Sequence, residues 1–214
     1  MIRIALLLIT SLMLTTTVMS QDKAAKKHLD KVSDKYATYD NMTLDISMVL
    51  TLPEEAPQTS EIEIVQEGLK YKILHPQQEI YCDGNDIWMY IADQNEVQIN
   101  DFDPEMEVEY MITPKDLLNQ YNSGKYSYQI SDKKQDQVQI EFLPNDRDSD
   151  YSKYRINIDT RNNDILQMWA FGKDGSLIAL EIKNQEVNQK LRADTFTFDI
   201  SKHPNIRIED LRLD

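Results

Sequence analysis

Several residue types are scarce in this 214-residue chain, which has one cysteine, five glycines, seven prolines and three histidines. A single cysteine excludes an intramolecular disulfide. So few glycines and prolines exclude collagen-like and low-complexity architectures. Positive charge is also scarce, because 23 Lys and Arg stand against 37 Asp and Glu, for a net charge of −14. Nucleic acids and anionic lipids bind cationic surfaces, so neither is an expected partner.

Long hydrophobic runs are absent after the first segment of the chain. Residues 4–14 read IALLLITSLML, which is too short to span a membrane and is typical of a signal peptide. Small side chains at Val18 and Ser20 predict cleavage after Ser20. We therefore expect a signal peptide over residues 1–20, one domain over residues 21–214, and export to the periplasm in soluble form.

Motifs for catalysis and metal binding are missing as well. The lone Cys82 lies too far downstream to carry the acyl chains of a bacterial lipoprotein, and no basic neighbour would activate it. Residues 146–150 (DRDSD) begin like a calcium loop, but Tyr151 stands where the pattern needs glycine and Asn157 where it needs glutamate. We expect no enzyme, no catalytic residue, no metal site and no cofactor, with weak calcium binding by this loop left open.

Two segments have the sequence pattern of helices. Residues 22–39 are amphipathic with Asp22 as a plausible N-cap, and their apolar positions are Ala25, Leu29, Val32 and Tyr36. Thr113 and Pro114 are typical of a helix start, and Leu117 and Leu118 follow on its apolar side. An acidic, methionine-rich stretch precedes this second helix.

The remaining segments alternate apolar and polar residues with a period of two. Turn signals such as Asp83-Gly84 and residues 172–175 separate them at hairpin spacing, which predicts about eleven strands in an antiparallel meander. Phe196 and Phe198 continue the strand pattern near the end. We expect a mainly β (α+β) domain whose sheet has one apolar face. Either a packed core or a hydrophobic cavity satisfies that pattern.

Four local patterns occur in a fixed order along the mature chain: LDKVSDKYATYDNMTLDISM, DGNDIWMY, TPKDLL, and INIDTRNNDILQMWAFGKDG followed by TFTFDISKHPNIRI. Together they resemble the LolA-type outer-membrane lipoprotein carrier family over essentially the whole mature chain. The resemblance implies an unclosed antiparallel β-barrel with a helical lid. It also implies a periplasmic chaperone that shields the acyl chains of lipoproteins in a hydrophobic cavity.

The resemblance further implies partners. The cargo would be triacylated lipoproteins, received from an inner-membrane ABC-type lipoprotein release complex and passed to an unidentified acceptor at the outer membrane. The carrier would be a monomer that binds no nucleic acid. Val65 and Gln66 stand where well-studied members have an Arg-Pro pair that tethers the lid, so that tether does not carry over to this chain.

A carrier of this kind needs apolar area, because burying one methylene is worth about 0.8 kcal/mol. The candidate acyl-chain residues are Leu44, Ile46, Met48, Ile62, Ile64, Leu69, Tyr71, Ile73, Met89, Trp88 and Tyr90. The candidate lid residues are Leu29, Met106, Met111, Leu117 and Leu118. Trp88 and Tyr90 match the family motif, but in a strand they point to the opposite face from Met89. The sequence does not show which of the two faces is the inward one.

One alternative function belongs to a different class. A periplasmic lipid- or protein-binding sensor module on the same fold would engage a partner instead of carrying cargo. A filled cavity under a packed cover would favour the sensor, whereas an open apolar cavity would favour the carrier.

Overall fold

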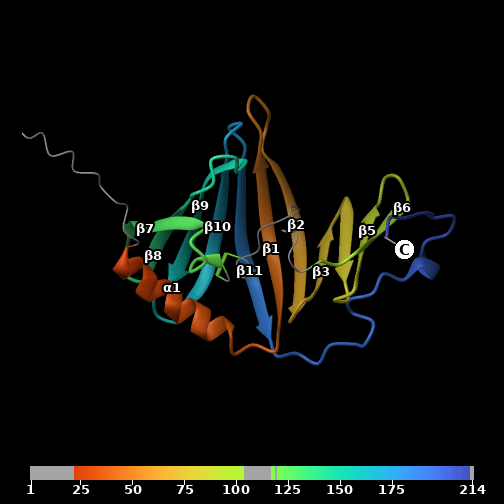
Figure 1. The fold of residues 1–214 in the computed structure, drawn as a ribbon, viewed down its shortest axis with the longest axis horizontal. Coiled ribbons are helices and arrows are strands. Elements are labelled where there is room, and N and C mark those ends of the chain that lie inside the picture. Colours follow the sequence, from red (N-terminus) through yellow and green to blue (C-terminus); the bar gives the residue numbers. More distant parts are fainter. Residues whose placement is uncertain (1–21, 104–116, 119, 213–214) are drawn as a thin grey trace, which may run out of the picture.

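The protein folds around one open sheet of twelve strands (Figure 1). The structure is a computed structural model that describes residues 22–103, 117–118 and 120–212. The strand order is β12-β6-β5-β4-β3-β2-β1-β11-β10-β9-β8-β7, and every neighbouring pair is antiparallel except β12 and β6. β7 and β12 do not pair with each other, which confirms the predicted mainly β, unclosed antiparallel barrel.

The helix α1 spans Lys23–Tyr36. The strands are β1 (Asn41–Thr51), β2 (Gln58–Glu67), β3 (Lys70–His75), β4 (Gln78–Cys82), β5 (Asp86–Ile91), β6 (Glu96–Asp101), β7 (Tyr126–Lys133), β8 (Gln137–Pro144), β9 (Tyr151–Asp159), β10 (Asp164–Gly172), β11 (Leu177–Val187) and β12 (Arg207–Asp210). A short 3-10 helix, η1, spans Ile200–Lys202. Among the described residues, no helix has the length and apolar character needed to cross a membrane.

One face of the sheet is apolar because alternate residues of each strand point to it. A row of side chains runs across five neighbouring strands in register, from Leu44 through Ile64, Ile73 and Ile80 to Met89. All five side chains are buried in one core cluster. Period-two burial on a curved sheet therefore builds the concave wall that the alternation predicts.

Helix α1 lies against the concave side of the sheet near the β7 edge (Figure 1). Its predicted apolar stripe is confirmed, since the buried residues are Ala25, Leu29, Val32 and Tyr36. The Asp22 carboxylate accepts hydrogen bonds from the backbone N–H groups of Ala24 (2.8 Å) and Ala25 (3.3 Å), as an N-cap does. It also accepts one from Ile130 N in β7 (3.1 Å), so one side chain both caps the helix and joins it to the sheet edge.

The C-terminal segment (residues 188–212) crosses to the outer face of the sheet beside β4–β6 (Figure 1). Phe196 and Phe198 do not form the expected strand, because no ladder pairs them. Both are buried, and the Phe198 ring lies 5.6 Å from the Tyr81 ring and 5.3 Å from the Tyr90 ring, between centroids. Ring packing, rather than a ladder of hydrogen bonds, therefore holds Phe198 in place, whereas β12 at the end of the segment pairs with β6.

Some expectations lie outside the described residues: the signal peptide, the helix start at Thr113, and the lid residues Met106 and Met111. Leu117 and Leu118 are described, are helical and are buried in the main core cluster.

Candidate functional site

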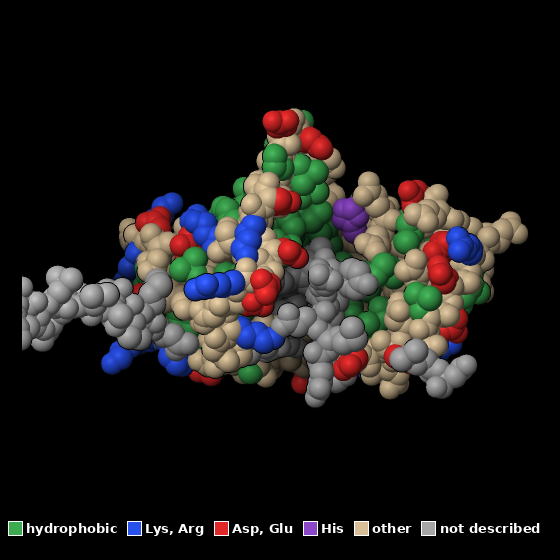
Figure 2. Space-filling view, turned by 45° about the horizontal axis from the view of Figure 1, so that its top comes forward, with side chains coloured by type: hydrophobic (Ala, Val, Ile, Leu, Met, Phe, Trp, Pro, Cys, Tyr) green, Lys and Arg blue, Asp and Glu red, His purple; other side chains and the backbone are tan. Residues whose placement is uncertain are grey.

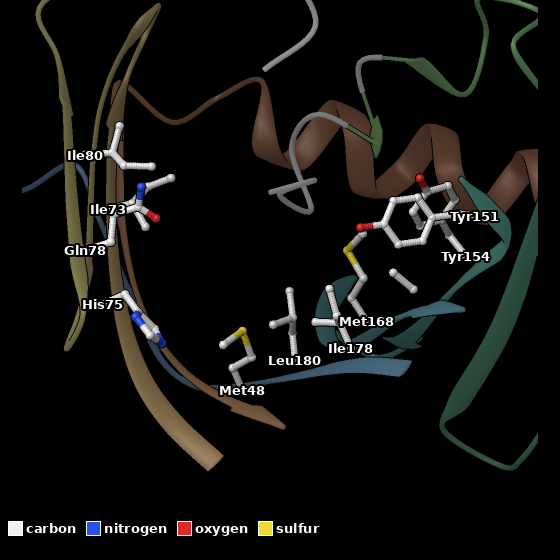
Figure 3. A pocket seen from close by; sticks show the side chains of 11 residues that line it. Met48, Ile73, His75, Gln78, Ile80, Tyr151, Tyr154, Met168, Ile178 and Leu180 are labelled. Atoms are coloured by element: carbon white, nitrogen blue, oxygen red, sulfur yellow. The ribbon is translucent and has the colours of Figure 1, made fainter. Parts of the chain in front are cut away.

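An open cavity of about 210 Å³ lies on the concave face of the sheet, towards the tip of the β1–β2 hairpin. Figure 2 shows hydrophobic side chains gathered below that projecting tip. The lining residues come from β1, β3, β4, β9, β10 and β11 (Figure 3), and they are Met48, Ile73, His75, Gln78, Ile80, Tyr151, Tyr154, Met168, Ala170, Ile178 and Leu180.

The floor of the cavity depends on pairing between strands that are distant in sequence. Met48 in β1 lies opposite Leu180 in β11, and Leu180 lies opposite Met168 in β10. Because these partners share a face, two thioethers and one isobutyl group form a continuous apolar floor. Ile73 and Ile80 rise on one side of it, and Tyr154 faces them from β9 on the other (Figure 3).

Polar groups stand at one side of the cavity, where β3 turns into β4. The Nδ1 atom of His75 accepts a hydrogen bond from the backbone N–H of Gln77 (3.2 Å), so this nitrogen carries no proton. The Nε2–H group then donates to Ser60 Oγ (3.1 Å). Two partners thus hold the His75 ring in one orientation.

No formal charge lines the cavity, since none of the described residues that border it is Asp, Glu, Lys or Arg. This is notable in a chain with a net charge of −14. Stripping water from an ion in such surroundings is costly without a partner. The site is therefore suited to an apolar ligand, or to the uncharged part of an amphipathic one.

The rest of the concave face is already filled by protein. Leu29 and Val32 from α1, together with Leu117 and Leu118, are 4% exposed or less and pack in the same cluster as Leu44. The apolar face is thus divided between a packed part under α1 and an open part near the hairpin tips.

Most candidate acyl-chain residues lie on this concave face. Six of them are buried in its core cluster: Leu44, Ile46, Ile62, Ile64, Ile73 and Met89. Met48 and Tyr71 are partly buried against the same cluster. Only Met48 and Ile73 of the whole candidate set border the open cavity.

Three candidates lie elsewhere. Leu69 is 62% exposed in the turn between β2 and β3, because Gly68 adopts a positive φ of 58° and ends β2 before it. Trp88 and Tyr90 point to the outer face of β5, where Phe198 covers them, while Met89 points to the concave core. The sequence left open which set of β5 side chains faces inward, and the structure shows that Met89 does. Trp88 and Tyr90 face outward and do not line the cavity.

Several residues of the cavity were not among the candidates. They are His75, Gln78, Ile80, Tyr151, Tyr154, Met168, Ala170, Ile178 and Leu180. The alternation of Ile178 with Leu180 was visible in the sequence, but nothing local shows that β11 pairs with β1.

The described residues contain no group of three or more His, Cys, Asp or Glu side chains arranged to hold a metal ion. Cys82 is buried, and burial raises the pKa of its thiol. A raised pKa disfavours the thiolate that nucleophilic chemistry requires.

The chain matches the family of outer membrane lipoprotein carrier protein LolA over residues 70–199, which is more than half of its length. It belongs to the LolA family. The matched region holds most of the residues that line the cavity, and only Met48 lies before it.

Solved structures extend the comparison. An uncharacterized conserved protein from Thermus thermophilus has a TM-score of 0.56 at 6% identity, over 88% of this chain and 99% of that one. A LolA superfamily protein from Nitrosomonas europaea has a TM-score of 0.44 at 14% identity, and the match covers 82% of this chain and 98% of that one. A chain of the MucA/MucB complex from Pseudomonas aeruginosa has a TM-score of 0.40 at 12% identity, and the match covers 83% of this chain and 62% of that one. The Thermus thermophilus likeness supports the fold alone. A comparison with curated proteins finds no match.

Proposed function

We propose that this LolA-family protein is a periplasmic carrier that shields lipoprotein acyl chains in its concave cavity and moves them from the inner to the outer membrane. One observation carries the proposal: the cavity is open, apolar and bordered by no charged residue of the described chain. An acyl chain costs on the order of 10 kcal/mol to leave in water, at about 0.8 kcal/mol per methylene. The cavity offers an alternative to that exposure.

Carriage needs no covalent step. A ligand displaces water from the floor formed by Met48, Met168 and Leu180, and the two flexible thioethers adapt to different chains. Release needs an affinity close to that of a membrane, which a small, open site supplies better than a sealed one. The proposed donor is an inner-membrane ABC-type release complex, and the proposed cargo class is acylated lipoprotein, triacylated forms included.

A second candidate function is a periplasmic binding or sensor module. The packed part of the concave face favours it, because Leu29, Leu117 and Leu118 already occupy space that a large cargo would need. Such a module would engage a lipid or protein partner without carrying it between membranes.

The test is native mass spectrometry with lipid extraction on the mature protein, purified without detergent. Ala170 lines the cavity, whereas Ala179 lies next to Ile178 and Leu180 on the opposite face of β11. We expect Ala170→Phe to remove bound acyl ligand and Ala179→Phe to retain it, with both variants folded by thermal melting. A wild-type protein that is ligand-free and refuses acylated peptides would overturn the carrier and favour the sensor.

A further inference from the structure

We propose that the outer face of β8–β10 carries a second binding site, which takes an uncharged glycan by stacking a sugar ring on Trp169 and binding its hydroxyls with neighbouring amides. This site goes beyond the proposed carrier function and does not depend on it, because the two sites lie on opposite faces of the sheet. An outer-face cavity of about 280 Å³ marks the place, close to the lower end of the range of about 300–1,000 Å³ that is usual for small-molecule sites.

The register of three strands builds the floor of this outer-face cavity. Gln139 in β8 lies opposite Asn157 in β9, and Asn157 lies opposite Gln167 in β10. The three amides therefore form one row across the sheet, and Trp169 follows two residues after Gln167 on the same face. All four residues border the cavity. Met168, between Gln167 and Trp169, points the other way into the concave core.

The ring of Trp169 is open to stacking. The side chain is half-buried, and within the described part of the chain no other ring or cation stacks on it and no hydrogen bond engages its indole N–H. The next outward residue of β10, Phe171, differs, because Lys153 Nζ and Arg155 Cζ lie 4.9 Å and 5.2 Å from its ring centroid. A sugar ring has one face of C–H groups that packs on a flat aromatic ring, and tryptophan adds an N–H donor to such a face.

The amides supply donors and acceptors side by side. Asn157 is 9% exposed, and its Nδ2 donates to Gln137 Oε1 (3.0 Å), which fixes the orientation of both amides. The Asn157 Oδ1 atom and the Gln137 NH₂ group are then left for a ligand. The Gln167 side chain has no hydrogen-bond partner among the described residues. A sugar hydroxyl both donates and accepts, so adjacent hydroxyls satisfy such a set.

Other ligand classes fit this cavity less well. Among the described residues, its only charged side chains are Asp132 and Lys134, which are opposite in sign. An acyl chain would bury the amides without partners, which is costly. A phosphate would meet one lysine in a chain with a net charge of −14. A peptide strand needs free backbone groups, whereas each of β8, β9 and β10 has a strand on both sides.

The experiment uses the two tryptophans of the chain as internal probes. Trp169 borders the outer-face cavity, whereas Trp88 packs with the C-terminal segment and does not border it. Isotope-labelled mature protein is titrated by NMR with N,N′-diacetylchitobiose and with cellobiose, and Trp169→Phe assigns the indole N–H signals. Sorbitol, which has hydroxyls but no ring, is the control ligand. The two disaccharides distinguish an N-acetylated glycan, such as that of a cell wall, from a plain glucan.

We expect at least one disaccharide to shift the Trp169 indole signal while the Trp88 signal stays unchanged, and sorbitol to shift neither. In the variants, binding is followed at the backbone amide signals of β9. Trp169→Ala should weaken binding by at least about tenfold, because stacking is lost. Gln167→Leu should weaken it by about threefold to tenfold, the loss for one hydrogen bond.

Two matched controls change the same outer face of the sheet outside the cavity. Phe171→Ala removes the other outward ring of β10, and Gln129→Leu removes an exposed amide of β7, and neither residue borders the cavity. Both variants should bind within about twofold of wild type. Thermal melting checks that every variant is folded.

Three results would overturn the proposal: no shift of the Trp169 indole signal at millimolar concentrations of either disaccharide, equal shifts of both tryptophans, or equal binding of sorbitol. The wild-type indole signals decide the outcome even where a variant fails to fold. Acyl ligands are absent throughout, so a failure here leaves the carrier function untouched.

Discussion

At the scale of single residues, Tyr36 ties α1 to the sheet. Its hydroxyl donates to Gln185 Oε1 (3.0 Å) and accepts from the backbone N–H of Ile165 (3.3 Å). Burial raises the pKa of Tyr36, so the hydroxyl stays protonated. We expect Tyr36→Phe to lower the free energy of unfolding by about 1–3 kcal/mol, because a buried N–H loses its partner. Amide exchange at Ile165 should accelerate, and unchanged exchange there would contradict the assignment.

Another single residue, Asp159, makes the free energy of unfolding depend on pH in the acid range. Its buried carboxylate accepts hydrogen bonds from Arg161 N (2.9 Å) and Nε (3.0 Å), and these lower the pKa of Asp159 to about 2. The pKa in the unfolded chain is about 3.9, so this stabilisation is present above about pH 4 and is lost as the pH falls towards 2. Urea unfolding across that window should show a smaller loss of stability for Asp159→Asn than for wild type. If the stability of the two proteins fell equally with pH, Asp159 would contribute nothing to the acid dependence.

At the scale of elements, the C-terminal segment is held to β6 by an ion pair with unequal exposure. The Glu96 side chain is 5% exposed and lies 3.0 Å from Arg207 Nη1, whose side chain is 71% exposed. We expect Arg207→Met to destabilise β12 by about 1–2 kcal/mol, between the values for exposed and buried pairs. Hydrogen exchange at Leu211, whose N–H donates to Ile99 O (2.8 Å), reports this loosening.

The matched control for that element is Arg192→Met. Arg192 pairs with Asp194 at 2.8 Å, but both side chains are well exposed, at 83% and 58%. Removing this pair should change stability by less than about 0.5 kcal/mol and leave Leu211 exchange unaltered. Equal effects of the two substitutions would mean that burial of Glu96 is irrelevant to how the segment is held.

At the scale of the whole molecule, an open apolar cavity coexists with a net charge of −14 and a sequence pI near 4.6. Repulsion should keep the protein off anionic bilayers at neutral pH. We expect co-sedimentation with phosphatidylglycerol vesicles to be negligible at pH 7 in low salt and to rise as the pH approaches 4.6. Zwitterionic vesicles are the control, and a similar rise with them would show that charge is not the barrier.

Periodicity predicted what depends on one strand or one helix at a time. The buried stripe of α1 and the inward set of Leu44, Ile46 and Ile64 follow from spacing alone. The outward position of Trp88 depends instead on where the C-terminal segment packs, because both faces of β5 are apolar. The cavity floor likewise depends on β1 pairing with β11, a contact between distant segments that no local pattern encodes.

That β1–β11 pairing has a consequence for how the chain folds. The strand from Asn41 to Thr51 emerges early, yet its partner from Leu177 to Val187 follows only near the end of the chain. Loop closure over such a separation is slow, and the ladder cannot form before the late strand is present. During synthesis from the N-terminus, the central seam of the sheet therefore stays open until β11 has been made, and the apolar face of β1 has no partner on that side before then.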